Sequence, residues 1–166
     1  MRGKKMIIGI ILITVGIIID QVTKVIAFRN FDELKDYKCL PGIFKIRLVE
    51  NEGAAWGFLS DHRWFLIIVT LIAIGFFIYL AKDFDLVENP IYSASFILIV
   101  TGTFGNFIDR IFNGDQILYG KVRDFLTFDF MNFPSFNFAD MCLTVGVIFL
   151  SYDILFGATG VRWTKG

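Results

Sequence analysis

The residues of this 166-residue chain that could do chemistry are mainly carboxylates. The single histidine, His62, excludes a multi-histidine metal site, and the chain has neither an H-E-x-x-H motif nor a G-x-S-x-G turn. Two carboxylates that share a water can hydrolyse a peptide, because close like charges keep one acid protonated while the other activates the water. We predict that Asp124 and Asp140 form this pair, since both are expected at a membrane edge that water reaches.

Other polar residues accompany this pair where apolar segments end. Charges within membrane spans are costly and are rarely kept without a partner or a function. These residues belong to the same end of the predicted helix bundle as the two acids, and a convergent polar cluster is the expected place for a site. The cluster contains Asp20, Lys24, Asn51, Asn106, Asp109, Arg110 and Asn137.

Purely structural roles stay open for several of these residues. Asp20 and Lys24 are four residues apart, so they can form an ion pair on one helix face. Asp109 and Arg110 can cap or pair at a helix end, and Asp140 suits the first turn of a helix because of the helix dipole. The same carboxylates could alternatively bind a cation.

Four strongly apolar segments must position these residues. The chain is 55% hydrophobic, with a mean hydropathy of +0.64, and a membrane span needs about 20 largely apolar residues. The segments lack the polar face that a helix of a soluble protein would show. We therefore predict an all-α membrane protein, a four-transmembrane-helix bundle that forms one integral membrane domain over residues 1–166. The predicted spans are residues 6–28, 64–81, 91–108 and 141–158.

The two longer connecting segments fall on the same side of this bundle. In residues 29–63, Phe44, Ile46 and Leu48 alternate with basic residues, which predicts a small half-buried β segment. Residues 109–140 are rich in phenylalanine, which indicates either an aromatic belt at the membrane interface or a surface that grips lipid. The basic amino-terminal residues favour a cytoplasmic start, although the first long segment is also rich in basic residues.

Composition argues against several other classes of protein. The net charge is zero and no basic cluster occurs, so nucleic acid is not an expected partner. Cys39 and Cys142 give neither a disulfide framework nor a metal-ligand spacing, and we expect no metal and no cofactor. A small ion- or proton-coupled membrane transporter is the alternative function. The charge-free second and third spans offer such a transporter no polar path.

Four short motifs resemble those of the lipoprotein signal peptidases, the signal peptidase II family. Their order and spacing, together with the four-span layout, agree with the family over essentially the whole chain. The motifs are DQVTK at 20–24, NEGAAWG at 51–57, GNFIDR at 105–110 and FNFAD at 136–140.

The resemblance implies a membrane aspartyl endopeptidase that removes the signal peptide of diacylglyceryl-modified prolipoproteins, just before the lipidated cysteine. It implies Asp124 and Asp140 as the catalytic dyad. Substrate binding is implied for Asp20, Asn51, Asn106, Arg110 and Asn137. Structural support is implied for Lys24, Gly53, Ala54, Gly105 and Asp109.

The resemblance also implies a location and partners. The chain would lie in the bacterial cytoplasmic membrane with both termini in the cytoplasm and the active site near the outer face. Membrane lipid would be a partner alongside the prolipoprotein substrate. A cyclic peptide of the globomycin type would be the inhibitor.

One departure from the family pattern concerns the first acid. The family usually reads V-V-D-F where this chain has Val-Arg-Asp-Phe at 122–125. A cation beside Asp124 could depress its pKa if the side chain turned inward. Because neighbours in an extended segment face opposite ways, we expect Arg123 to point to water or lipid headgroups. Asp115 and Asp129 are the weaker candidates for the first acid.

Overall fold

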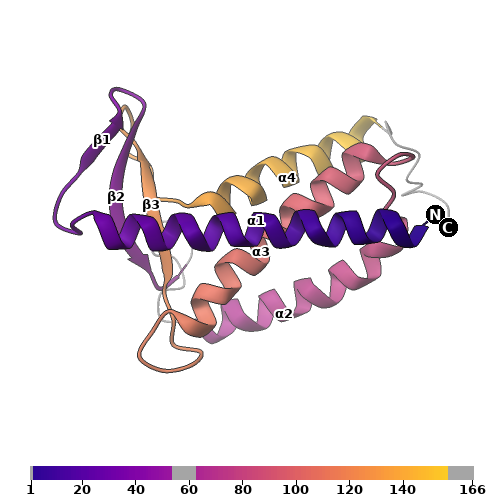
Figure 1. The fold of residues 1–166 in the computed structure, drawn as a ribbon, viewed down its shortest axis with the longest axis horizontal. Coiled ribbons are helices and arrows are strands. Elements are labelled where there is room, and N and C mark those ends of the chain that lie inside the picture. The colour runs from indigo at the N-terminus through magenta and orange to yellow at the C-terminus, as the bar shows by residue number, and fades with distance from the viewer. Residues whose placement is uncertain (1, 54–62, 157–166) are drawn as a thin grey trace.

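The computed structural model describes residues 2–53 and 63–156, which form a helix bundle with a small sheet at one end (Figure 1). Within this part of the chain, four helices are long and apolar enough to cross a membrane. The helices are α1 (Arg2–Asn30), α2 (Arg63–Leu80), α3 (Pro90–Phe112) and α4 (Phe138–Phe156). A short 3-10 helix, Ala81–Asp83, follows α2. The predicted fold class is confirmed.

The helices differ from the predicted spans mainly at their ends. The helix α3 continues past residue 108, so its last turn carries Asp109 and Arg110. The helix α4 begins at Phe138, before the predicted span, whereas residues 157 and 158 of that span lie outside the described residues. Hydropathy indicates which residues can lie in hydrocarbon, but backbone hydrogen bonds and caps decide where a helix ends.

The bundle turns large apolar side chains outward. Ile10 of α1, Ile72 of α2 and Leu155 of α4 are 58%, 67% and 74% exposed. The interior instead contains small and polar residues, such as Ser93 and Gly102 of α3. Small residues at helix contacts and apolar residues on the outer surface are typical of helices packed within lipid. This distribution agrees with a multi-pass membrane protein.

The sheet covers one end of the bundle. Its strands are β1 (Tyr37–Leu40), β2 (Phe44–Asn51) and β3 (Val122–Phe128), antiparallel and in the order β1-β2-β3. The predicted β segment lies within β2, whereas β1 and β3 were not predicted. Gly42 in the turn between β1 and β2 has a φ of 78°, a left-handed conformation that glycine adopts without strain.

Contacts between α1 and the sheet fix how the sheet sits on the bundle. Ala27 near the end of α1 packs with Leu48 of β2 and Phe125 of β3 in a small buried core. In β2 and β3, Val49 lies opposite Asp124 and Asn51 lies opposite Val122. The segment that contains Asp124 is therefore a strand held against α1.

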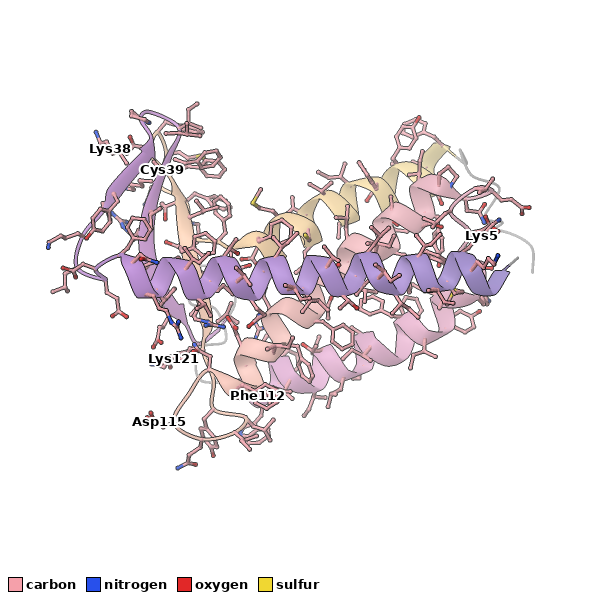
Figure 2. All side chains as sticks on the ribbon, in the orientation of Figure 1. Lys5, Lys38, Cys39, Phe112, Asp115 and Lys121 are labelled. Carbon is pink, nitrogen blue, oxygen red and sulfur yellow. The ribbon has the colours of Figure 1, made fainter. Side chains whose placement is uncertain are left out.

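An ion pair lies at the end of the bundle far from the sheet. Lys5 lies at the end of the bundle far from the sheet, whereas Lys38, Cys39 and Lys121 lie at the sheet end (Figure 2). At the far end, Lys5 Nζ forms an ion pair with Asp85 Oδ2 at 2.6 Å. This pair ties the start of α1 to the connection between α2 and α3.

Candidate active site

Asp124 extends from β3 and is almost completely buried, with 2% of its surface exposed. Its Oδ2 accepts a hydrogen bond from Asn51 Nδ2 at 3.0 Å, and its Oδ1 accepts one from Asn137 Nδ2 at 2.7 Å. Asn51 ends β2 and is itself held, because its Oδ1 accepts the backbone N–H of Gly53 at 2.9 Å. Both oxygens of Asp124 therefore have fixed amide partners.

Burial changes the acidity of this carboxyl group. Removal from water, followed by the negative charge of Asp140, raises the pKa of Asp124 to about 7. The hydrogen bonds from Asn51 and Asn137 act in the opposite direction, because they favour the ionised form. A carboxyl with this pKa can hold a proton near neutral pH, as a general acid must.

Asp140 lies in the first turn of α4 and takes part in capping that helix. Its backbone N–H donates to Asn137 Oδ1 at 3.0 Å, and its Oδ2 accepts the backbone N–H of Asn137 at 3.0 Å. This reciprocal pair is a capping box, here with aspartate at the third helical residue. The other carboxylate oxygen, Oδ1, accepts from Asn106 Nδ2 at 2.8 Å.

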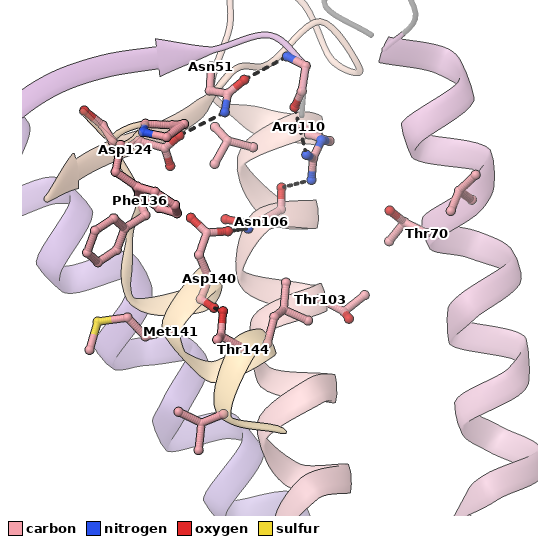
Figure 3. A pocket seen from close by; sticks show the side chains of 18 of the residues that line it. Asn51, Thr70, Thr103, Asn106, Arg110, Asp124, Phe136, Asp140, Met141 and Thr144 are labelled. Atoms are coloured by element: carbon pink, nitrogen blue, oxygen red, sulfur yellow. Dashed lines mark hydrogen bonds between the residues drawn. The ribbon is translucent and has the colours of Figure 1, made fainter. Parts of the chain in front are cut away.

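Two asparagines connect the carboxylates. Asn137 Nδ2 donates to Asn106 Oδ1 at 3.0 Å as well as to Asp124. Asn106 in turn donates to Asp140 (Figure 3). A continuous set of hydrogen bonds thus runs from Asp124 through Asn137 and Asn106 to Asp140. Such a network holds two acids in a fixed relation.

A set of buried charges lies against this network. Lys24 Nζ is 2.8 Å from Asp20 Oδ2 and 3.2 Å from Asp109 Oδ2, and all three side chains are 0% exposed. Lys24 also donates to Asn106 Oδ1 at 3.0 Å. The ion pair between Asp20 and Lys24 is present as the spacing allowed, and Asp109 makes it part of a larger cluster. Asp20 Oδ1 also accepts the backbone N–H of Ala139 at 2.9 Å.

The expectation for Arg123 was wrong. Its guanidinium does not point to water or headgroups: Nη2 lies 2.6 Å from Asp109 Oδ1 and 3.0 Å from Gln21 Oε1. The side chain leaves β3 away from Asp124, as strand alternation requires. On that side the end of α3 supplies a buried carboxylate, Asp109, and opposite charges attract more strongly in a protein interior than in water.

Gly105 permits the close approach of three helices here. A Cβ atom at this residue would lie 2.6 Å from Asp20 Oδ2 and 3.0 Å from Ala139 Cβ. Any larger residue would therefore push Asp20 of α1 or Ala139 of α4 away from α3. The predicted supporting role of Gly105 agrees with this packing.

The acids face a cavity of about 670 Å³ between α2, α3, α4 and the sheet (Figure 3). Polar side chains gather at the end near the sheet, and the remainder of the wall is largely apolar. The polar end includes Asn51, Asn106, Arg110, Asp124 and Asp140. The walls from the helices include Val69, Thr70, Ala73, Thr103, Met141, Leu143, Thr144 and Val145.

Hydroxyl groups on these walls are turned to the backbone. Thr70 Oγ1 donates to Leu66 O, and Thr144 Oγ1 donates to Asp140 O, each at 2.8 Å. The hydroxyls are therefore satisfied within their own helices, which leaves the methyl groups for the cavity. The cavity combines a polar end with a long wall suited to apolar chains.

The predicted binding residues do not all reach this cavity. Asn51, Asn106 and Arg110 line it, whereas Asp20 and Asn137 are 0% exposed and are not among its described lining residues. Asn137 instead binds Asn106, Asp124 and Asp140, which line the cavity, whereas Asp20 binds Lys24 and the backbone N–H of Ala139.

The residues predicted to give structural support also lie in different parts of the structure. Gly53, predicted as support, lines the cavity, and its carbonyl oxygen accepts from Arg110 Nη2 at 3.4 Å. Lys24 and Asp109 belong to the buried charge cluster. Ala54 lies outside the described residues.

The two weaker candidates for the first acid lie elsewhere. Asp115 is exposed in the loop after α3 (Figure 2), and Asp129 Oδ2 accepts the backbone N–H of Gly42 at 3.2 Å. Neither residue lines the cavity among the described residues.

The buried ion pair of Arg123 with Asp109 was not predicted. The available signal was a basic residue amid apolar strand residues, together with Asp109 at the end of the preceding helix.

The groups around the two carboxylates are largely hydrogen-bond donors. Within the described residues, no three His, Cys, Asp or Glu side chains converge. Asn51, Asn106 and Asn137 present N–H donors to the carboxylates, and such donors would repel a cation. A pair of carboxylates without a cation can polarise a water and share its proton.

Comparisons with known proteins agree with this architecture. The family described as signal peptidase (SPase) II matches residues 12–156. The chain is 37% identical over 148 residues to "Lipoprotein signal peptidase" of Lactiplantibacillus plantarum, which covers 89% of this chain and 94% of that protein. It is 35% identical over 142 residues to the protein of the same description from Symbiobacterium thermophilum, covering 84% and 89%.

The fold is also similar to solved structures. A bacterial membrane enzyme determined by the in meso method at 2.3 Å resolution matches with a TM-score of 0.80 and 31% identity, over 95% of this chain and 93% of that one. A second such enzyme, determined at 1.9 Å resolution, matches with a TM-score of 0.76 and 34% identity, over 89% and 92%. The chain therefore belongs to the signal peptidase II family of membrane proteases.

Proposed function

We propose that this chain is an aspartic endopeptidase that removes the signal peptide of diacylglyceryl-modified prolipoproteins and cleaves just before the lipidated cysteine. The observation that carries the proposal is the placement of Asp124 and Asp140 at the polar end of a largely apolar cavity. Their joint hydrogen-bond network through Asn137 and Asn106 supports a role as one unit. The relatives described as lipoprotein signal peptidases support the substrate class.

The reaction needs one proton shared by the two acids. The ionised carboxyl accepts a proton from a water whose oxygen attacks the scissile carbonyl carbon. The protonated carboxyl donates to the carbonyl oxygen, so that a tetrahedral intermediate forms without a free oxyanion. When the C–N bond breaks, the acid that took the proton from water gives it to the leaving amine of the lipidated cysteine. The other carboxylate takes a proton from a hydroxyl group of the intermediate, so the new carboxyl group forms and the pair again holds one proton. The pair titrates as a unit, and its proton belongs to both acids.

Arg110 and Asn51 would bind the substrate backbone beside the acids. Both line the cavity, and Arg110 contacts Gly53 O and Asn106 O only at 3.4 and 3.5 Å. A guanidinium has five N–H donors, so Arg110 has donors left for peptide carbonyl groups. Fixing an extended peptide in this way brings the scissile bond to the water.

The apolar wall would hold the lipid chains and the apolar part of the signal peptide. Val69, Ala73 and Val145 belong to this wall, and the large apolar side chains outside the bundle would face membrane lipid. A globomycin-type cyclic peptide would occupy the same cavity and compete with substrate. The bilayer therefore contributes to affinity, because the substrate reaches the cavity already anchored in it.

The sheet end of the bundle would face the outside of the cell. Lys4 and Lys5 lie at the opposite end, and basic residues at a span's end favour the cytoplasmic side. Both termini would then be cytoplasmic. Family membership does not favour the alternative of a small ion-coupled transporter.

A gel-shift cleavage assay on a diacylglyceryl-modified precursor tests the proposal. Asp124→Asn and Asp140→Asn should each lower the rate by about 1,000-fold or more, as is typical when a residue of a catalytic unit is removed. Asp115→Asn and Asp129→Asn, which change acids outside the cavity, serve as matched controls and should cleave at the wild-type rate. All four proteins should extract from membranes in equal yield.

Several outcomes would contradict the proposal. If Asp124→Asn kept the wild-type rate and Asp129→Asn or Asp115→Asn lost it, the first acid would be one of those two residues. Equal cleavage of an unlipidated precursor would contradict the binding of lipid chains by the cavity. If the wild type failed on a competent precursor, the proposed activity itself would be wrong.

A further inference from the structure

A buried ion cluster packs against the strand that carries Asp124, and the proposed reaction does not use it. It contains two carboxylates, Asp20 and Asp109, and two cations, Lys24 and Arg123. Arg123 is 15% exposed, whereas the other three side chains are 0% exposed. An unpaired buried charge is costly, so each ion in this balanced set depends on the others.

Arg123 is the member that joins the cluster to β3. Its Nη2 lies 2.6 Å from Asp109 Oδ1 and 3.0 Å from Gln21 Oε1, and its Nε lies 3.4 Å from Asp109 Oδ2. Its backbone N–H also donates to Asp109 Oδ2, at 2.9 Å. A single residue of β3 is thus held by α3 through its backbone and side chain, and by α1 through its side chain.

The residue that follows this anchor is Asp124. The carbonyl oxygen of Arg123 accepts from Asn137 Nδ2 at 3.4 Å, and the same nitrogen lies 2.7 Å from Asp124 Oδ1. Arg123 is not among the described residues that line the cavity. Arg123 therefore contacts the proposed acids only indirectly: through the backbone of β3 and Asn137 to Asp124, and through Asp109, Lys24 and Asn106 to Asp140.

We propose that Arg123 is a positioning residue, which by binding Asp109 and Gln21 fixes β3 where Asp124 meets Asn137. The inference rests on the proposed function, because it concerns the alignment of the proposed first acid. A guanidinium suits this task, because its planar fork reaches two oxygens of one carboxylate and a third acceptor together. A lysine would supply the charge without the fork.

The experiment separates alignment from charge balance. Arg123→Val removes the side-chain contacts of this anchor, keeps its backbone hydrogen bond to Asp109, and leaves the cluster one positive charge short. The double change Arg123→Val with Asp109→Asn removes the anchor but leaves Asp20 and Lys24 as a balanced pair. Arg123→Lys keeps the charge. The matched control is Lys121→Val. Lys121 lies just before the same strand, and its Nζ pairs with Glu52 Oε1 at 2.8 Å on the surface.

The measurements are kcat, KM and the unfolding temperature of each purified protein, with a diacylglyceryl-modified precursor as substrate. Arg123→Val and the double variant should lose about tenfold to a hundredfold in kcat, the size expected from a small misplacement of a reacting group. KM should stay within about twofold of the wild-type value, because these changes remove no contact that binds the substrate and the transition state equally. The double variant should recover unfolding temperature without recovering kcat. Arg123→Lys should fall between wild type and Arg123→Val, and Lys121→Val should match wild type.

Other results would overturn the inference. A double variant with wild-type kcat would show that Arg123 only balances buried charge. A loss confined to KM would place Arg123 in substrate binding instead. Asp124→Asn belongs in the same series: if it cleaves normally, the proposed function of Asp124 fails and the alignment role falls with it. If it is inactive while Arg123→Val and the double variant turn over normally, only the inference on Arg123 fails.

Discussion

Asn137 Nδ2 lies 2.7 Å from Asp124 Oδ1, although Asn137 is the N-cap residue of α4 and Asp124 belongs to β3. The residue that begins the last helix is therefore also a partner of the proposed first acid. Capping and acid alignment use different atoms of one side chain, Oδ1 for the cap and Nδ2 for the acid. Substitutions can thus separate the two roles.

We expect Asn137→Ala to lose both roles and Asn137→Ser to lose only one. Loss of an N-cap costs about 1 kcal/mol of stability, and serine caps a helix about as well as asparagine. Asn137→Ser should therefore have a higher unfolding temperature than Asn137→Ala while both lose cleavage, because the hydroxyl keeps the cap but cannot replace the amide donor to Asp124. Unfolding temperature and kcat of both variants check this. Equal, wild-type kcat in the two variants would contradict a role in alignment.

The pH dependence of cleavage should show an alkaline limb near neutral pH. The pKa of Asp124 is raised to about 7 by burial and by the charge of Asp140, so above this pH the pair loses its shared proton. We expect kcat/KM to fall as pH rises through 7, as measured in a pH–rate profile of the free enzyme. A profile flat from pH 6 to pH 9, in roughly constant salt, would be inconsistent with this assignment.

The same pKa predicts how stability depends on pH. Between the ordinary value of 3.8 and about 7, the folded state binds more protons at Asp124 than the unfolded state does. The contribution of this group to the free energy of unfolding therefore decreases as pH rises across that window, by at most about 1.4 kcal/mol per pH unit. The free energy of unfolding of Asp124→Asn should lack this decrease with pH. At pH 8 its unfolding temperature should therefore be higher than that of the wild type. An identical pH dependence in the two proteins would refute the prediction.

Gly105→Ala should disturb the junction of α1, α3 and α4. The added Cβ would meet Asp20 Oδ2 at 2.6 Å and Ala139 Cβ at 3.0 Å, so the helices must separate. Overpacking of this kind typically costs about 1–3 kcal/mol. Gly75→Ala is the matched control, because a Cβ there meets nothing within 4 Å and alanine favours the helix. Unfolding temperature and cleavage should fall for Gly105→Ala and be kept for Gly75→Ala.

Asp20→Asn should act through stability and not through KM. Asp20 is 0% exposed and neutralises Lys24, and breaking one partner of a buried ion pair costs about 3–5 kcal/mol. We expect a much lower unfolding temperature, and a KM unchanged in the protein that remains folded. A variant with normal stability and raised KM would return Asp20 to the substrate site, as the family resemblance implied. Thermal unfolding and steady-state kinetics decide between these outcomes.

The sequence predicted the parts of this structure that depend on local pattern. The four spans follow from hydropathy, β2 from the alternation at Phe44, Ile46 and Leu48, and the pairing of Asp20 with Lys24 from their spacing. Each of these features involves residues close together in the chain. The polar cluster near the sheet was also predicted, because its members lie at the same end of the predicted helix bundle.

Contacts between distant segments could not be predicted in the same way. The partner of Asp124 across the sheet depends on a register shift in β2 between Ile46 and Val49, which no local pattern specifies. The orientation of Arg123 depended on a buried carboxylate arriving from α3, Asp109. The burial of Asp20 and Asn137, which removes them from the described cavity wall, required the packing of whole helices.

The placement of the two acids on either side of the entry to α4 has a consequence for biosynthesis. Asp124 lies in the strand made before the last helix, and Asp140 with its cap lies in the last helix itself. A nascent chain that has inserted three helices thus carries only one acid of the proposed catalytic pair, and on the proposed function it could not cut lipoprotein precursors. If the two acids act as proposed, proteolytic activity would begin only when the last helix has entered the bilayer.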